Sequence, residues 1–272
     1  AASLAQAFFP VFLHQSYLQD PAAHADWLAF WGELEARLKR EGLPSIAAIY
    51  TLTEYEEELP VEILYRPFVV DHHFGWTLAH EKLTQIRLAE TEKYAHVTYF
   101  FNGGEERVFD GEKRVLVPSP REVRTYDLKP EMSAVQVTDQ LLQELGSGGY
   151  RFAVVNYANC DMVGHTGNLR AAIDAVEVVD GCLGRILEWA IGASAFVVVT
   201  ADHGNCEMMQ ADNGEPLTSH TLLPVPFIVF DPKGGKHPLR SGGRLCDIAP
   251  TLLDLWGVAA PAEMTGKTLI AH

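Results

Sequence analysis

The sequence has little positive charge for its length. It carries 21 lysines and arginines against 36 aspartates and glutamates, which gives a net charge of −15 over 272 residues. Nucleic acids and anionic membranes attract proteins through basic surfaces, so this composition argues against both as partners. An acidic protein can still bind an anionic substrate where metal cations reverse the local field. The composition is therefore still compatible with a small anionic ligand that is bound through metal ions.

Long apolar runs and paired cysteines are also missing. No apolar segment reaches the ~20 residues that a membrane-spanning helix needs. The opening residues, AASLAQAFFPVFL, are apolar but carry no positively charged leader, and Pro10 interrupts them. The cysteines form no CxxC motif, which favours free thiols in a reducing cytoplasm over a disulfide framework; they are Cys160, Cys182, Cys206 and Cys246. The chain does not begin with Met, and we expect it to be part of a longer protein.

Apolar strands and amphipathic helices alternate along most of the chain, which predicts an α/β fold. A helix is expected to start at Asp20 and to end at Gly42. We place a domain boundary near residue 67, which divides the chain into residues 1–67 and 68–272. Helices are expected at 133–146, 168–189 and 247–256, the first with a capping box of Ser133 and Gln136. Strands are expected at 85–89, 96–101, 151–156, 196–200 and 225–230.

Two segments join a predicted strand to acidic and histidine residues. They are VVNYANCDMVGHTG, at 154–167, and VVVTADHGNCE, at 197–207. Each begins as a β-branched run typical of a buried strand in a parallel sheet. The first continues into Asp161 and His165, and the second into Asp202 and His203. Because ligands bind beyond the carboxyl ends of the strands in open α/β sheets, the segments predict two walls of one site.

The spacing within these segments fits metal coordination. Asp161 and His165 are four residues apart, so a helical turn places both on one face. Asp202 and His203 are adjacent and can act together only on an irregular turn, which the following glycine allows. His220 lies in a polar stretch downstream. Carboxylates with imidazoles suit Zn²⁺ or Mn²⁺ better than Ca²⁺, and two ions ~4 Å apart can activate a nucleophile and hold a phosphate oxygen.

Each of these features alone also has a simpler interpretation. A single Asp-x3-His pair is usually a surface pair, and DHG after a strand is commonly a helix N-cap followed by a turn. Lys93 follows another predicted strand and can hold a phosphate as a point charge, although such a lysine is more often solvated. Cys160 and Cys206 lie beside the acid–histidine motifs, where a cysteine ligand is the less favoured interpretation.

Several longer segments resemble one known family, in the family's order, over residues 45–270. They are AETEKYAHVTYFFNGG, PSPREVRTYDLKPEMSA, VVNYANCDMVGHTGNLRAAIDAVEVVD, TADHGNCE, SHTLLPVPFIV, DIAPTLLDLWGV and PAEMTGKTLI. On these residues the chain resembles the C-terminal half of the cofactor-independent (2,3-bisphosphoglycerate-independent) phosphoglycerate mutases, in the alkaline phosphatase superfamily. The resemblance implies an alkaline-phosphatase-like, largely parallel sheet flanked by helices. Residues 68–272 would be the metal-binding phosphatase domain, and residues 1–67 the tail of an α/β phosphotransferase domain with its linker.

The resemblance also implies two divalent metal ions. Mn²⁺ is the first expectation, with Zn²⁺, Co²⁺ and Mg²⁺ as alternatives. Asp161, His165 and His220 match the protein ligands of one ion, whereas Asp202 and His203 match two ligands of the other.

Lys93 matches the family lysine that contacts the phosphorylated centre. The implied reaction interconverts 3-phosphoglycerate and 2-phosphoglycerate through a phosphoserine. It belongs to glycolysis and gluconeogenesis, in the cytoplasm.

Two parts of the family pattern have no counterpart here. One is the Ser nucleophile together with a further Asp ligand, and the other is the arginine cluster that grips the substrate. Smaller departures are Cys160, where Pro is common, and residues 72–83, which match poorly. We therefore expect a portion of the mutase that is inactive alone and needs the N-terminal half in trans. The alternatives are a non-catalytic metal- or partner-binding module and a metal-dependent phosphomonoesterase.

Overall fold

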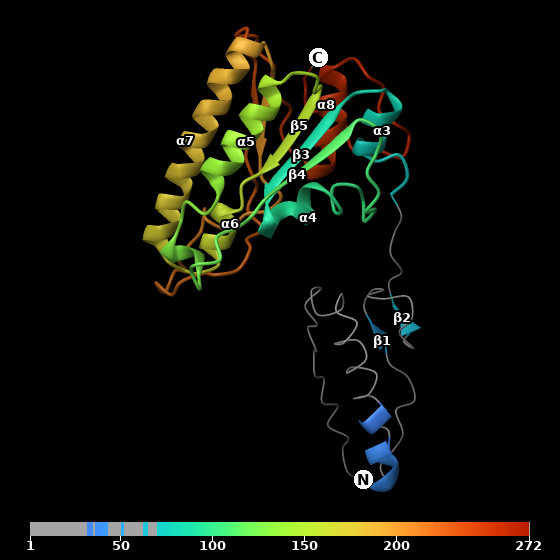
Figure 1. Cartoon of the computed structure of the whole chain (residues 1–272), viewed down its shortest axis with the longest axis vertical. Coiled ribbons are helices and arrows are strands. Elements are labelled where there is room, and N and C mark those ends of the chain that lie inside the picture. The colour runs from blue at the N-terminus through green and yellow to red at the C-terminus, as the bar shows by residue number, and fades with distance from the viewer. Residues whose placement is uncertain (1–31, 35, 43–49, 52–61, 65–69, 272) are drawn as a thin grey trace. The chain divides into compact units, whose positions relative to one another are not determined.

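The computed structural model describes residues 32–34, 36–42, 50–51, 62–64 and 70–271 (Figure 1). The chain divides into two compact units, Ala1–Phe68 and Val69–His272. In the first unit, residues 36–40 are helical and Gly42 follows with a φ of 66°, the left-handed conformation that ends helices. Strands β1 (Tyr50–Thr51) and β2 (Glu62–Ile63) pair in parallel. The expected helix start at Asp20 and the boundary near residue 67 lie outside the described residues.

The second unit is built on a parallel sheet with the strand order β4-β3-β5. Its strands are β3 (Gln85–Glu90), β4 (Glu112–Val117) and β5 (Phe152–Asn156). Every residue of β3 is buried, because this strand has a neighbour on each side and helices on both faces. The predicted α/β class with a parallel sheet is therefore confirmed.

A second, two-stranded sheet consists of β6 (Val197–Thr200) and β7 (Phe227–Phe230), which pair antiparallel. Among the described strands, β6 pairs only with β7, and β5 pairs only with β3. The sequences FAVVN and VVVT are those of strands buried on both sides, yet every residue of β5 is only partly buried and none of β6 is fully buried. Both strands thus present an open edge within the described part of the chain.

Helices cover the two faces of the β4-β3-β5 sheet (Figure 1). On one face, α5 (Ala134–Gly146) and α7 (Leu169–Ala193) pack their apolar sides on the strands, with Leu88, Val137 and Ile186 in the shared core. On the other face, α3 (Phe74–His80) and α8 (Ile248–Leu255) enclose a second core. No helix among the described residues is long and apolar enough to cross a membrane.

An arginine lies at the centre of this sheet. Arg87, in the middle of β3, is 0% exposed. Its guanidinium donates to Gln85 Oε1 at 2.5 Å and 3.1 Å and to the Val97 carbonyl at 3.2 Å, and it lies 4.1 Å from the centre of the Phe101 ring. Burial lowers the pKa of Arg87 to about 10, so the group stays charged at neutral pH.

Two local predictions are wrong. Residues 96–101 were expected as a strand, but a 3₁₀ turn (Thr91–Lys93) leads into the helix α4 (Tyr94–Val97). The Thr98 hydroxyl donates to the Tyr94 carbonyl at 2.8 Å, and local turns of this kind override the β propensity of the segment. The expected capping box of α5 is absent as well, because the Ser133 hydroxyl donates to the Pro118 carbonyl at 2.8 Å instead.

Candidate metal centre

The first acid–histidine motif lies on the short helix α6 (Asn159–Gly164), which directly follows β5. Asp161 is in its first turn, and His165 is the residue that caps its end. One helical turn separates them, and His165 Nε2 lies 3.1 Å from Asp161 Oδ1. The predicted placement of both side chains on one face is therefore confirmed.

The second motif is folded back against the segment that contains His220. Gly204 and Thr221 form an antiparallel bridge, in which the Thr221 amide donates to the Gly204 carbonyl at 3.0 Å. The Glu207 carboxylate strengthens this connection by accepting from the Thr221 hydroxyl and, at 2.6 Å, from the backbone N–H of Asn205. As a result the His203 and His220 rings stack, with their centres 3.7 Å apart.

Three ligand atoms, two from α6 and its C-cap and one from His220, form a nearly equilateral triangle. His220 Nε2 lies 3.0 Å from Asp161 Oδ1 and 3.1 Å from His165 Nε2, and the third side, between Asp161 and His165, measures 3.1 Å. His203 offers a further ligand atom, within 4.8 Å of ligand atoms of Asp161 and His220. The structure thus brings together four of the five residues in which the sequence predicts metal ligands.

Hydrogen bonding determines where the protons of this triangle lie. His165 Nδ1 is 2.6 Å from the Thr218 carbonyl, which can only accept, so Nδ1 carries the ring proton and Nε2 presents a lone pair. His220 Nε2 faces this lone pair and a carboxylate oxygen, so it is the donor in the ion-free chain. A divalent cation bound at Nε2 would require the other neutral tautomer of His220, with the ring proton on Nδ1.

Asp161 is held ionised by two neighbours. Lys93 Nζ lies 2.5 Å from Asp161 Oδ2, and Asn205 Nδ2 donates to Asp161 Oδ1 at 2.9 Å and to its carbonyl at 3.2 Å. Burial alone would raise the pKa of Asp161, but the bonds from Lys93 and Asn205 outweigh it and hold the pKa at about 2. The carboxylate is therefore charged over the whole physiological range, as a metal ligand must be.

Asn205 is itself positioned by a close approach of the backbone. A side-chain Cβ at Gly164 would lie 2.2 Å from Asn205 Oδ1 and 2.7 Å from its Cγ. Asn205 is 5% exposed, and its Oδ1 has no hydrogen-bond partner among the described residues. A glycine at position 164 is thus what lets this amide lie against α6 and reach Asp161.

Asp202, the fifth predicted ligand, lies apart from the triangle. Its carboxylate accepts from the His203 amide at 3.1 Å and lies 3.6 Å from His203 Nε2, and its side chain is 47% exposed. Lys93, by contrast, is buried at 4% exposure and ion-paired to Asp161. The structure therefore places Lys93 at the candidate centre rather than in solvent.

Three residues of this site were not predicted from the sequence: His96, Asn205 and Glu207. His96 lies on α4 three residues after Lys93, and its buried Nδ1 has no hydrogen-bond partner among the described residues. Burial lowers the pKa of His96, and the charge of Lys93 lowers it further, whereas the carboxylates of Asp161 and Asp202 act in the opposite direction. The only signal in the sequence was the position of these residues beside the named motifs.

Two cysteines meet beside the triangle. Cys206 Sγ donates to the Cys160 carbonyl at 2.7 Å, which brings the two cysteines into contact. This contact lowers the pKa of Cys160 and raises that of Cys206. All four cysteines are free thiols, as predicted.

Comparison with known proteins shows which family the chain resembles. The family model described as the metalloenzyme superfamily matches residues 40–260. A 2,3-bisphosphoglycerate-independent phosphoglycerate mutase of a Synechococcus species (strain JA-2-3B'a(2-13)) is 50% identical over 239 residues, which cover 85% of this chain and 45% of that protein. The protein of the same name from Syntrophotalea carbinolica is 51% identical over 231 residues, with the same coverage. The chain thus spans about half the length of the curated relatives it matches.

A solved structure has the same fold. The Leishmania mexicana phosphoglycerate mutase, in crystal structures at low cobalt concentration, superimposes with a TM-score of 0.72 and 31% sequence identity. The match covers 82% of this chain and 44% of the Leishmania chain. The share of the matched protein is again close to one half.

Proposed function

Because the chain belongs to the metalloenzyme superfamily, we propose that it is the metal-binding portion of a 2,3-bisphosphoglycerate-independent phosphoglycerate mutase. Relatives with this name are about 50% identical to the chain, and the chain spans about half of their length. The observation that carries this proposal is the triangle of Asp161, His165 and His220 with Lys93 beside it. The whole reaction would interconvert 3-phosphoglycerate and 2-phosphoglycerate in the cytoplasm.

The family and the ligand cluster both support binding of a divalent metal ion. We propose Mn²⁺ as the preferred ion, because a mixed set of carboxylate and imidazole ligands suits it; Co²⁺, named with the Leishmania structures, is the nearest alternative.

We propose that Asp202 and His203 contribute to a second ion, whose remaining ligands come from outside this chain. Two protein ligands fall short of the roughly four donors that a stable site needs, so this site should bind weakly in the isolated chain. His203 stacks on His220, which would keep the two ions close together. Such a pair of ions neutralises the charge of a transferred phosphoryl group.

Lys93 would hold the substrate phosphate. Its ammonium group is held in place by Asp161 before the substrate binds. A phosphate oxygen beside the centre could then accept a hydrogen bond from the same ammonium group. His96 lies within the same charge cluster, and its unpaired Nδ1 is a further polar group that such an anion could contact. None of these residues is a nucleophile. The phosphoserine of the proposed reaction must therefore form on another polypeptide segment.

The open strand edges support a partner that supplies this segment in trans. The apolar residues of β5 and β6 lack the cover that β3 has, and α6 and the DHG turn follow directly from these two strands. A partner backbone that pairs with the open edges would bury them and place its own side chains at the candidate centre. We propose the N-terminal half of the mutase as that partner.

Complementation tests the proposal. The chain is assayed with Mn²⁺ for 2-phosphoglycerate formation from 3-phosphoglycerate, first alone and then with the N-terminal half of a related mutase. We expect no activity alone and measurable activity on complementation. His165→Ala should abolish the regained activity, whereas His237→Ala, which removes a histidine paired with Asp231 at 3.0 Å, should retain it. Transfer by the chain alone, or equal activity of both variants, would contradict the assignment.

A further inference from the structure

We propose that Cys160 and Cys206 form an oxidation-sensitive dithiol whose disulfide joins helix α6 to the turn after β6 at the candidate metal centre. Cys160 is the second residue of α6, next to Asp161, and Cys206 follows Asn205 in the turn after β6. The 45 residues between them in the sequence include all of α7 and β6, yet the Cys206 sulfur contacts the Cys160 carbonyl. This modification site does not depend on the proposed function.

The distance between the residues suits a disulfide. Cys206 Sγ lies 2.7 Å from the Cys160 carbonyl oxygen, and a carbonyl oxygen lies about 3 Å from the Cβ of its own residue. The Cys206 sulfur is therefore at most about 6 Å from the Cys160 Cβ, and rotation about the Cα–Cβ bond can turn the Cys160 thiol toward it. A bond of ~2.05 Å between the sulfurs then needs side-chain rotation together with movement of the turn that contains Cys206.

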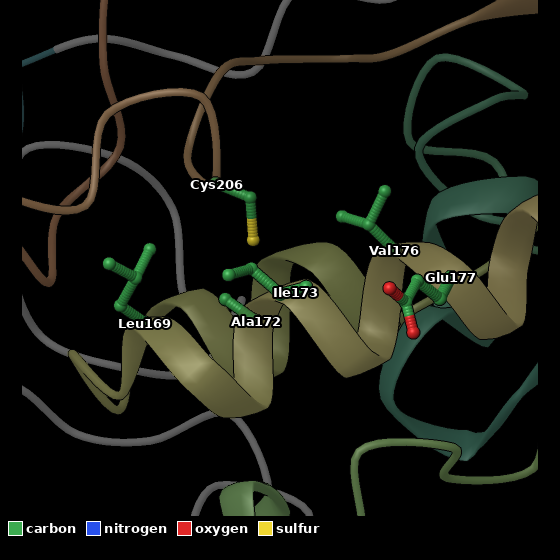
Figure 2. A pocket seen from close by; sticks show the side chains of 6 residues that line it. All are labelled: Leu169, Ala172, Ile173, Val176, Glu177 and Cys206. Atoms are coloured by element: carbon green, nitrogen blue, oxygen red, sulfur yellow. The ribbon is translucent and has the colours of Figure 1, made fainter.

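An oxidant can reach one of the two thiols. Cys206 lines a surface pocket over the N-terminal half of α7, and Figure 2 shows its sulfur directed toward this helix. The other residues of the pocket are Leu169, Ala172, Ile173, Val176 and Glu177. Leu169, Ile173 and Val176 are each more than 40% exposed, so the pocket is open to solvent and admits a small oxidant such as hydrogen peroxide.

The chemistry balances with one peroxide for each disulfide. One of the two sulfurs attacks a peroxide oxygen as its thiolate, the O–O bond breaks, and a sulfenic acid forms with release of one water. The other cysteine sulfur then attacks the sulfenic sulfur, and the sulfenic oxygen leaves as a second water with the remaining thiol proton. Two thiols are oxidised by two electrons, and hydrogen peroxide is reduced to two waters. A thiol reductant reverses the step by exchange.

Such a bond would act on the candidate centre through its neighbours. Asp161 follows one sulfur-bearing residue, and Asn205, which orients Asp161, precedes the other. Disulfides in reducing compartments are usually transient and sense oxidants. The pair is therefore placed to report the oxidation state of its surroundings at the metal centre.

Peptide mapping tests the proposal on the full chain. Each cysteine falls in its own tryptic peptide: Cys160 in 152–170, Cys182 in 171–185, Cys206 in 186–233 and Cys246 in 245–267. After treatment with hydrogen peroxide and alkylation of the remaining thiols, we expect peptides 152–170 and 186–233 to be joined. The number of free thiols should fall from four to two, and dithiothreitol should restore all four.

Single substitutions supply the controls. Cys160→Ser and Cys206→Ser should each lose the cross-link, whereas Cys246→Ser, which removes the exposed thiol, should form it as the unmodified chain does. The proposal is overturned if the chain without substitutions keeps four free thiols after peroxide treatment, or if the treatment joins a different pair of peptides. It is also overturned if both thiols oxidise further to sulfinic acids without a cross-link.

Discussion

Asn205 should determine how tightly the candidate centre holds a metal ion. Asn205→Ala removes both donations to Asp161, at 2.9 Å and 3.2 Å, without touching a proposed ligand. A hydrogen bond to a charged group contributes about 1.5 to 3 kcal/mol, and loss of a group that orients a ligand lowers metal affinity about 10- to 100-fold. We expect a loss in that range for Mn²⁺, measured by calorimetric titration of the metal-free chain.

Gly164→Ala should weaken Mn²⁺ binding as Asn205→Ala does, because it displaces the Asn205 side chain from Asp161. The new Cβ would lie 2.2 Å from Asn205 Oδ1, closer than real Cβ contacts, so the amide must move away from Asp161. In the double variant, the three nearest atoms to that Cβ are gone, because all of them belong to the Asn205 side chain. The double variant should therefore bind metal as Asn205→Ala does. It should also be more stable than Asn205→Ala, by up to about 1 kcal/mol, since alanine replaces glycine in a helix.

A matched control separates this contact from general effects of alanine. Gly184 also lies in a helix, α7, and a Cβ there would meet no atom within 4 Å. Gly184→Ala should raise stability and leave metal affinity unchanged. If the two losses of affinity in Gly164→Ala and Asn205→Ala instead add in the double variant, Asn205 does not transmit the effect of position 164, and the reasoning fails.

Three further predictions concern charge and metal binding. Lys93→Met should bind Mn²⁺ more tightly, because it removes a cation beside Asp161, but should abolish the complemented activity; weaker binding in the titration would contradict the first part. Mn²⁺ at about 100 times its dissociation constant should stabilise the chain by about 2.7 kcal/mol, a rise of roughly 5 to 10 °C in Tm that a chelator reverses and that His165→Ala lacks. Burial lowers the pKa of His73, whose Nδ1 accepts from the Trp76 amide at the start of α3, so the unfolded chain binds the proton more readily. Stability should therefore be full above pH 6.5 and decline below it; His73→Asn, which keeps an acceptor, should lose that part of the pH slope in urea unfolding at pH 8 and pH 5.5.

The sequence predicts what local patterns determine. The alternation of apolar runs and amphipathic segments located β3, β5, β6 and α7, and the four-residue spacing of Asp161 and His165 correctly placed both on one helical face. The prediction of a strand at 96–101 was wrong because the β-branched and aromatic residues of this segment favour a strand in isolation, whereas the chain becomes helical directly after β3. The identities of the metal ligands stay predictions.

The parts that were missed depend on contacts between distant segments. Asn205 reaches Asp161 across 44 positions, and nothing in NCE distinguishes a residue that orients a ligand from one in an ordinary turn. The sequence pattern named His220 as a candidate ligand, but the bridge between Gly204 and Thr221 that brings it to Asp161 has no local signature. Pairing of this kind is a property of the folded chain, and no periodicity encodes it.

The buried Arg87 has a consequence for Lys93, which lies six residues further along the chain, just after the end of β3. Because side chains alternate between the faces of a strand, a shift of β3 by one residue against its neighbours would turn Arg87 toward the apolar core of Leu88, Val137 and Ile186. An unpaired guanidinium there is prohibitive, so this alternative alignment is excluded during folding. The same shift would move the end of β3, and Lys93 with it, by about 3.3 Å, which is enough to break its 2.5 Å contact with Asp161. Arg87 therefore allows only one alignment of β3 with its neighbouring strands. This alignment in turn fixes the position of the Lys93 ammonium group beside Asp161.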